Sequence, residues 1–238
     1  MREYVVAADD LEPIRAEGDT AETRVAFDST RGSGVLEQRV VRFEPGRSQP
    51  QPLASLQGIL YIVSGAGSLE VDGRTHSLEP EMGAYCVGES FVVDNPGPAD
   101  LVAVLVTAPG RDGLEADPDR RTIRLADRSP LPAGTDREFR YLVHADLGCP
   151  DVTQFVGTIP PGRAPTHSHV YDEVVYVLEG SGQLHINGGS SPLAPGSCLH
   201  LPALVEHALE NSTGAPMRVL GVFHPSGDPA SRASEANE

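Results

Sequence analysis

The stretch YIVSGAGSLEVDG, residues 61–73, has a close copy in YVLEGSGQLHING, residues 176–188. Each copy begins with tyrosine and apolar residues, passes through Gly-x-Gly into an alternating segment, and ends in a turn that closes with glycine. Self-similarity at such a long period indicates that one supersecondary unit is encoded twice. We therefore expect the chain to fold as two related halves.

The similarity extends beyond this stretch in both directions. FEPG at residues 43–46 precedes the first copy, and IPPG at residues 159–162 precedes the second. Downstream, HSLEPEMGAYCV parallels SPLAPGSCLHL, each with a turn between two short strand-like segments. We expect the boundary in the polar segment GRDGLEADPDRR, which divides the chain into domains of residues 1–119 and 120–238.

Both halves consist of short segments rich in Val, Leu, Ile and Tyr. These segments recur at roughly ten-residue intervals and are separated by Gly, Pro, Asn and Asp. The 25 glycines and 21 prolines fit many tight turns, and helical periodicity is weak. The sequence therefore predicts an all-β protein made of two tandem barrels of the jelly-roll kind.

Charge and composition exclude several classes of function. With 34 acidic and 18 basic side chains, the formal net charge of -16 repels nucleic acid and anionic membranes. All the basic residues are arginines, so Schiff-base and P-loop chemistry, which need lysine, are absent. We expect a small-molecule partner instead.

Cysteine usage and the lack of targeting signals indicate the compartment. Cys86, Cys149 and Cys198 are odd in number and widely spaced, which indicates neither a disulfide framework nor a paired-cysteine metal site. No leader-like segment and no apolar run of membrane-spanning length occurs. We expect a cytoplasmic protein with reduced, mostly buried thiols.

A cluster of metal-capable residues stands just before the second copy of the repeat. His167 and His169 are two residues apart, so on a strand they share one face. Glu173 follows after a short turn, and His207 arrives from a distant segment. A lone strand histidine is more often an ordinary polar residue, but four such residues predict one divalent transition metal, and Fe, Mn, Ni, Co, Cu and Zn all suit the donor set.

These residues resemble the two motifs of the cupin superfamily. The first motif corresponds to Gly162, His167, His169, Glu173 and Gly180, and the second to Gly189, Pro195, Gly196, His207 and Asn211. The chain departs from the motifs in two loops: four residues separate Gly162 from His167, and Leu204 stands where glycine is common. The resemblance implies a bicupin with its metal in the second barrel.

The first half lacks the corresponding ligands. Alignment of Gly65 with Gly180 places Pro52, Ala54 and Gly58 where the second half has its ligands. We therefore expect a metal-free first barrel that shapes the mouth of the second barrel or an interface in a homodimer or larger homo-oligomer. An empty first cupin is also similar to the ureidoglycine aminohydrolases, although their ligand order differs and their substrate-binding lysine has no counterpart here.

Three functions are compatible with these observations. The first is a metal-dependent enzyme acting on a small oxygenated or carboxylated metabolite, of the quercetinase-like dioxygenase type. The second is a non-redox hydrolase or isomerase, and the third is a metabolite-binding protein without turnover. Tyr171, Arg163 and His200 are the candidates for catalytic contact with an anionic substrate, beside an apolar wall that contains Val175 and Val177.

Overall fold

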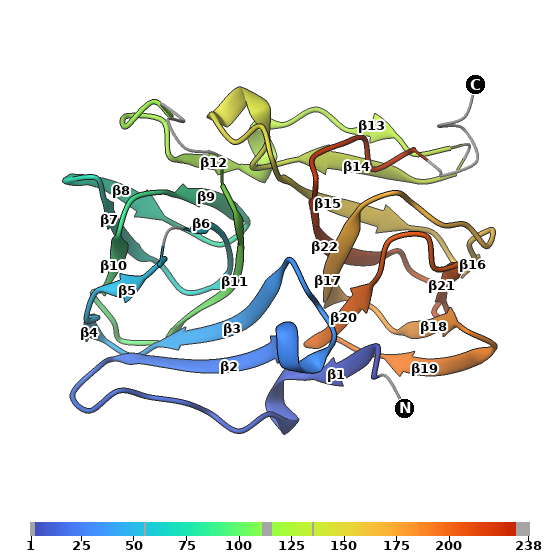
Figure 1. Ribbon diagram of the computed structural model, residues 1–238, viewed down its shortest axis with the longest axis horizontal. Coiled ribbons are helices and arrows are strands. Elements are labelled where there is room, and N and C mark those ends of the chain that lie inside the picture. The colour runs from blue at the N-terminus through green and yellow to red at the C-terminus, as the bar shows by residue number, and fades with distance from the viewer. Residues whose placement is uncertain (1–2, 55, 111–115, 135, 232–238) are drawn as a thin grey trace.

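The computed structural model describes residues 3–54, 56–110, 116–134 and 136–231 (Figure 1). In this part of the chain there is no α-helix, and the predicted all-β class is confirmed. Short 3-10 turns occur at Ala8–Asp10 (η1), Ser29–Arg31 (η2), Leu125–Asp127 (η3) and Ala145–Leu147 (η4). Among the described residues, no helix has the length and apolar character needed to cross a bilayer.

Two sheets form the first barrel. The six-stranded sheet has the order β12 (Thr122–Arg124), β9 (Met82–Cys86), β6 (Leu56–Ser64), β11 (Leu101–Pro109), β3 (Glu37–Phe43) and β2 (Ala21–Phe27). The second sheet has the order β4 (Gly46–Arg47), β10 (Ser90–Asn95), β7 (Gly67–Val71) and β8 (Arg74–Leu78), with β5 (Gln51–Pro52) also paired to β10. All of these pairings are antiparallel.

The second barrel repeats this plan. Its seven-stranded sheet has the order β1 (Val5–Ala7), β20 (Ser197–Leu201), β17 (Asp172–Glu179), β22 (Met217–His224), β15 (Thr153–Ile159), β14 (Glu138–Tyr141) and β13 (Leu131–Pro132). Its four-stranded sheet has the order β16 (Gly162–Arg163), β21 (His207–Asn211), β18 (Gly182–Ile186) and β19 (Gly189–Leu193). The two barrels lie side by side in Figure 1.

Strands β6 and β17 are buried on both faces, which explains their nearly continuous apolar sequences. Alternate side chains of a strand point to opposite faces of the sheet. In β17, Val175 and Val177 belong to the core of the second barrel, whereas Val174 and Tyr176 belong to a cluster shared with the first half. That shared cluster, which also contains Tyr61 and its neighbours, packs the two barrels together.

The repeated Gly-x-Gly is required by close backbone contacts. Gly65 and Gly180 have φ values of 80° and 83°, which L side chains rarely adopt. At Gly67 a Cβ would lie 2.4 Å from the carbonyl oxygen of Asp94, and at Gly182 it would lie 1.8 Å from that of Glu210. Neither second glycine can carry a side chain without displacing the neighbouring strand.

The turn that closes each copy is a two-residue hairpin. Asp72-Gly73 joins β7 to β8, and Asn187-Gly188 joins β18 to β19. All four residues have positive φ, between 50° and 74°. Asp-Gly and Asn-Gly favour this conformation because it matches the twist of the flanking strands.

The halves exchange edge strands. Strand β1, from the start of the chain, pairs with β20 of the second barrel, with Val6 opposite Cys198. Strand β12, which lies beyond residue 119, pairs with β9 of the first barrel, with Ile123 opposite Gly83. The division at residue 119 stays a prediction, and strand pairing crosses it twice.

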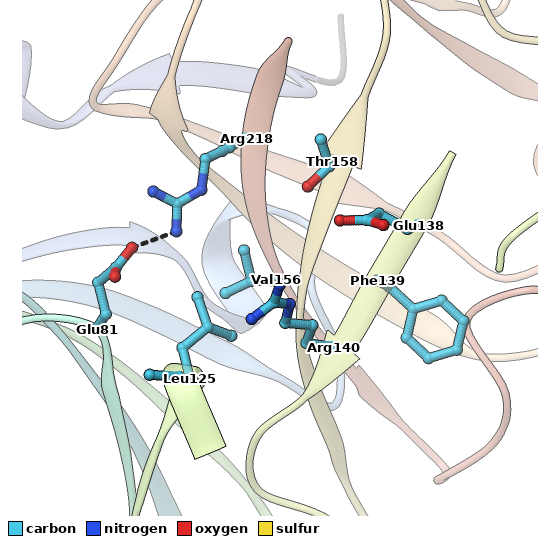
Figure 2. A pocket seen from close by; sticks show the side chains of 9 residues that line it. Glu81, Leu125, Glu138, Phe139, Arg140, Val156, Thr158 and Arg218 are labelled. Carbon is cyan, nitrogen blue, oxygen red and sulfur yellow. Dashed lines mark hydrogen bonds and ion pairs between the residues drawn. The ribbon is translucent and has the colours of Figure 1, made fainter. Parts of the chain in front are cut away.

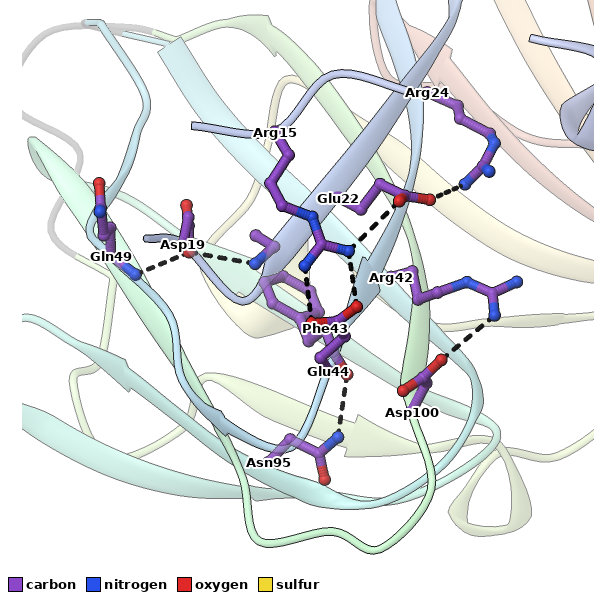
Figure 3. A network of polar contacts seen from close by, with 11 residues as sticks. Arg15, Asp19, Glu22, Arg24, Arg42, Phe43, Glu44, Gln49, Asn95 and Asp100 are labelled. Carbon is purple, nitrogen blue, oxygen red and sulfur yellow. Dashed lines mark hydrogen bonds and ion pairs between the residues drawn. The ribbon is translucent and has the colours of Figure 1, made fainter. Parts of the chain in front are cut away.

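Polar contacts hold the segment after β1 against the first barrel (Figure 3). The guanidinium of Arg15 donates to both carboxylate oxygens of Glu44 at 2.6 and 2.7 Å, and to Glu22 at 3.2 Å. Asp19 accepts a hydrogen bond from the backbone N–H of Gln49 at 2.9 Å. Because these ion pairs are partly exposed to solvent, they fix the path of the chain and contribute little to stability.

Candidate metal centre

The backbone brings three histidines together at one end of the second barrel. His167 and His207 form an isolated antiparallel bridge, in which the two N–H···O distances are 3.0 and 2.9 Å. The carbonyl oxygen of His169 accepts from the backbone N–H of Leu204 at 2.8 Å. The loop before β17 is thus tied to the segment that leads into β21.

The predicted ligand side chains face one another. The ring centroids of His167 and His207 are 4.7 Å apart, and those of His169 and His207 are 4.9 Å apart. Glu173 Oε2 lies 3.1 Å from His169 Nε2. His169, Glu173 and His207 are buried, with relative exposures of 2%, 7% and 2%.

Backbone carbonyls set the tautomer of each imidazole. The Nδ1 atoms of His167, His169 and His207 lie 3.1, 2.8 and 2.9 Å from the carbonyl oxygens of residues 165, 171 and 205, respectively. A carbonyl oxygen only accepts, so each Nδ1 must carry the proton and donate it. The lone pair of each ring therefore resides on Nε2, as in histidines that bind a metal through that atom.

Burial and charge act in opposite directions on these imidazoles. Burial lowers the pKa of His207 to about 4, so this ring is neutral at physiological pH. Burial is the largest single effect on His169 and lowers its pKa, but the Glu173 carboxylate, the Tyr171 carbonyl and Asp172 together raise the net pKa of His169 above its ordinary value. The Glu173 carboxylate therefore stabilises a positive charge placed next to it.

Three imidazoles and one carboxylate are suitable ligands for a divalent transition metal, although their side chains are not yet arranged around a common point. Within the described residues, no group of three or more His, Cys, Asp or Glu side chains is arranged to hold an ion as it stands. His169 Nε2 is buried, and no hydrogen bond to it is found in that part of the chain, although Glu173 Oε2 lies 3.1 Å away. An orphaned imidazole nitrogen beside a carboxylate suits a cation between them.

A cavity of about 110 Å³ opens beside the four side chains. Its wall is mostly apolar and includes Phe139, Phe155, Ile159, Val175, Leu201 and Val219. Its polar lining includes Tyr171, Thr158, Arg137 and Glu138 besides the predicted ligands. A few polar groups in an apolar cup are typical of a small-molecule site.

Gly221 on β22 leaves the space that Glu173 occupies. A Cβ at this position would lie 2.8 Å from Glu173 Oε1, and 2.3 and 2.4 Å from Cε1 and Cζ of Phe155. Gly221 is not among the site residues predicted from the sequence, although a lone glycine in the apolar run MRVLGVFH signals a close approach of another group.

Tyr171 lines the cavity, and its contacts there are structural. Its ring stacks between His169 and Phe223, with centroid distances of 4.2 and 3.8 Å. Its carbonyl oxygen accepts from His169 Nδ1, and burial raises the pKa of its phenol. Tyr171 therefore holds the plane and the tautomer of His169.

Arg163 and His200 do not line this cavity. Arg163, on β16, is exposed and lines a separate surface hollow with Thr166 and Glu206. His200 is fully buried, and its Nε2 lies 2.9 Å from Asp172 Oδ1 on the outer face of β17. The structure thus separates both of these candidates from the other predicted site residues.

The first half holds the outer face of the strand that carries Glu173. Ser33 Oγ donates to Asp172 Oδ2 at 3.2 Å, immediately before Glu173. Gln38 Nε2 donates to the carbonyl oxygen of Val175 at 3.1 Å, two residues after it. These two contacts fix β17 on both sides of Glu173.

The sheet register identifies the residues of the first barrel that correspond to the candidate ligands. The side-chain amide of Asn95 donates to carbonyl oxygens 52 residues before it and 4 residues after it, and that of Asn211 does the same. Asn95 on β10 therefore corresponds to Asn211 on β21. Phe91 then corresponds to His207, and its partner Gln51 corresponds to His167. The sequence alignment, which used Pro52, was one residue out of register in this loop.

Apolar side chains fill this part of the first barrel. Leu53 and Phe91 are each 1% exposed and belong to its core. A Cβ on Gly58, which corresponds to Glu173, would lie 2.8 Å from Leu53 Cδ2. Buried apolar side chains therefore fill the position in the first barrel that the imidazoles and the carboxylate occupy in the second.

Comparisons with known proteins identify the fold. Residues 155–223 match the family model of the cupin domain. No curated protein matches the sequence. The second half thus contains a cupin domain, which confirms that part of the resemblance found in the sequence.

Solved structures resemble the chain over most of its length. Ylba from E. coli is 15% identical with a TM-score of 0.76, and the match covers 94% of this chain and 91% of that chain. A Pseudomonas aeruginosa protein described as glyoxylate induced is 19% identical with a TM-score of 0.77, covering 94% and 90%. A variant of Bacillus subtilis oxalate decarboxylase is 15% identical with a TM-score of 0.73, covering 95% and 78%. At such identities the similarity shows the fold alone.

Proposed function

We propose that this chain is a divalent-metal-dependent enzyme that acts on a small oxygenated or carboxylated metabolite in the cavity of its second barrel. The observation that carries the proposal is the placement of three Nδ1-protonated imidazoles and a buried carboxylate beside one apolar cavity. Neutral imidazoles and a carboxylate are ligands for borderline divalent metals.

His167, His169, Glu173 and His207 would hold the ion. Bound there, Fe, Mn, Ni, Co, Cu or Zn would supply a Lewis acid or, if redox-active, support a reaction with oxygen. The chain's own residues prepare the site: backbone carbonyls orient the imidazoles, and the apolar side chains of the wall offer few groups that bind water. Low water content strengthens electrostatic contacts with a bound substrate.

A dioxygenase-type reaction is the first to test. Four protein donors leave open positions in an octahedral shell, which suit a chelating substrate and a second small reactant. Non-redox hydrolysis or isomerisation needs the same donors but no oxygen. Dependence on oxygen therefore separates these two reaction classes.

The first half, in this proposal, is a metal-free barrel that supports the second. Leu53 and Phe91 close its interior, and Ser33 and Gln38 hold the strand that carries Glu173. The proposed division at residue 119 assigns the ligands to one half and this support to the other.

Metal analysis and an oxygen-consumption screen test the proposal. The purified full chain should contain about one divalent ion per chain after reconstitution, and His169→Ala should lose it while keeping its β-rich circular dichroism spectrum. A panel of small carboxylates and enediols should include one compound whose turnover requires the ion. Equal metal content in the wild type and His169→Ala would refute the site. Metal-dependent turnover that persists without oxygen would replace the dioxygenase with a Lewis-acid enzyme.

A further inference from the structure

We infer that Arg137 binds a carboxylate group of the substrate, and that the substrate portion enclosed with it is short. The inference rests on the proposed function, because it assumes that the cavity beside the imidazoles receives the substrate. Arg137 is the only arginine among the described residues that line this cavity.

Among the described residues, the guanidinium of Arg137 is held by Asp136 alone. Its Nε and Nη2 atoms lie 3.0 and 3.3 Å from Oδ1 and Oδ2 of Asp136, respectively. The backbone at this position is also fixed, because the Arg137 carbonyl oxygen accepts from the N–H of Ala133 at 2.9 Å. The Arg137 side chain is 20% exposed, compared with 56% for Asp136.

The remaining donors of Arg137 match a carboxylate. A guanidinium has five N–H donors, and Asp136 occupies one on Nε and one on Nη2. The second N–H of Nη2 and those of Nη1 can still form a two-point contact with a carboxylate. Asp136 thus orients the Arg137 guanidinium and leaves the edge formed by Nη1 and Nη2 available for a substrate carboxylate.

The other charges of the lining favour this assignment. Glu173 also lines the cavity and would repel a carboxylate placed beside it. Away from the predicted ligands, Arg137 therefore offers the attractive position for an anionic end group. The apolar wall formed by Phe139 and Phe155 is suited to the uncharged part of the substrate.

The volume limits what is enclosed. An apolar cavity of about 150 Å³ is sufficient for benzene. The cavity here is about 110 Å³. By this scale, about four to five non-hydrogen atoms fit between Arg137 and the imidazoles.

Arg140, on β14 and three residues after Arg137, provides a matched control. Residues 137 and 139 alternate along the chain with residues 138 and 140, and Figure 2 shows Arg140 directed toward Leu125 and Val156 while Phe139 points away. Arg140 lines a different hollow, of about 290 Å³, where Arg218 contacts Glu81. Replacing Arg140 removes the same charge without changing the lining of the proposed substrate cavity.

Binding of glycolate to the zinc-loaded full chain tests the inference by calorimetry. Glycolamide is the neutral probe of the same size, and mandelate is the larger one. Arg137→Gln should weaken glycolate binding by about 10- to 100-fold, the worth of hydrogen bonds to a charged group, and should leave glycolamide binding unchanged. Arg137→Lys should recover part of the loss, Arg140→Gln should behave as wild type, and mandelate should bind more weakly than glycolate.

The outcomes separate this inference from the proposed function. Absence of zinc binding in the wild type would refute the metal site itself. Normal zinc content in all variants, with equal glycolate affinity in Arg137→Gln and the wild type, would overturn the role of Arg137 alone. Mandelate binding as tightly as glycolate would overturn the size limit.

Discussion

Replacing Gly221 with alanine should displace Glu173 and weaken metal binding. The new Cβ would lie 2.3 Å from Phe155 Cε1 and 2.8 Å from Glu173 Oε1. Comfortable contacts between carbon atoms lie near 3.5 Å or beyond, so the ring must move by about 1 Å. Overpacking of this kind costs about 1–3 kcal/mol, which corresponds to a fall in Tm of about 2–12 °C for a chain of this size.

Gly157 supplies the matched control. It lines the same cavity, but a Cβ there would lie 3.4 Å from both Phe155 and Val219. Gly157→Ala should therefore change Tm and metal affinity little, whereas Gly221→Ala should weaken metal binding by about 10- to 100-fold, as disturbed ligand support does. Differential scanning calorimetry and metal titration measure both effects. Wild-type metal affinity in a folded Gly221→Ala variant would refute the reasoning.

Three further predictions concern acid stability, the thiols and the contact between the halves. His207 takes up a proton near pH 6.5 in the unfolded chain but only near pH 4 in the folded chain. Its contribution to the unfolding free energy is therefore complete above pH 6.5 and falls by about 3 kcal/mol as metal-free protein is acidified to pH 4. Urea titrations at several pH values should show a smaller loss of unfolding free energy for His207→Asn than for the wild type. Burial raises the pKa of the Cys149 and Cys198 thiols to about 12, so a thiol reagent should label them only after denaturant is added, and rapid labelling of native protein would contradict this. Ser33→Ala leaves one oxygen of Asp172 without its donor and should lower the unfolding free energy by about 1 kcal/mol, measurable by urea titration, while unchanged stability would show that this contact does not matter.

The fold could be predicted because its local signals agree with one another. Gly-x-Gly, Asp-Gly and Asn-Gly mark backbone conformations that other residues avoid, and the structure has those conformations in both copies. The apolar runs of β6 and β17 are read correctly as strands because both faces are buried. The grouping of His167 and His169 follows from the two-residue period of extended chain.

Contacts between segments that are distant in the sequence could not be predicted from these local patterns. His200 and Tyr171 looked alike as polar candidates, but the register of β17 with β20 places His200 on the face away from the cavity. Arg137 was not identified because it immediately precedes β14, and the pairing of β14 with β15 joins segments that the sequence does not show to be neighbours. Gly221 carries no side chain, so its importance is visible only in what surrounds it.

The exchange of edge strands has a consequence for the order of events during synthesis. Residues Val5–Ala7 leave the ribosome early, but their partner strand Ser197–Leu201 follows about 190 residues later. At roughly 5–20 residues per second, translation leaves β1 without its partner for roughly 10–40 s. Strand β12, in contrast, finds β9 already made. The first barrel can therefore close while the chain is growing, whereas the sheet that carries Glu173 acquires its edge strand only when most of the protein has been translated.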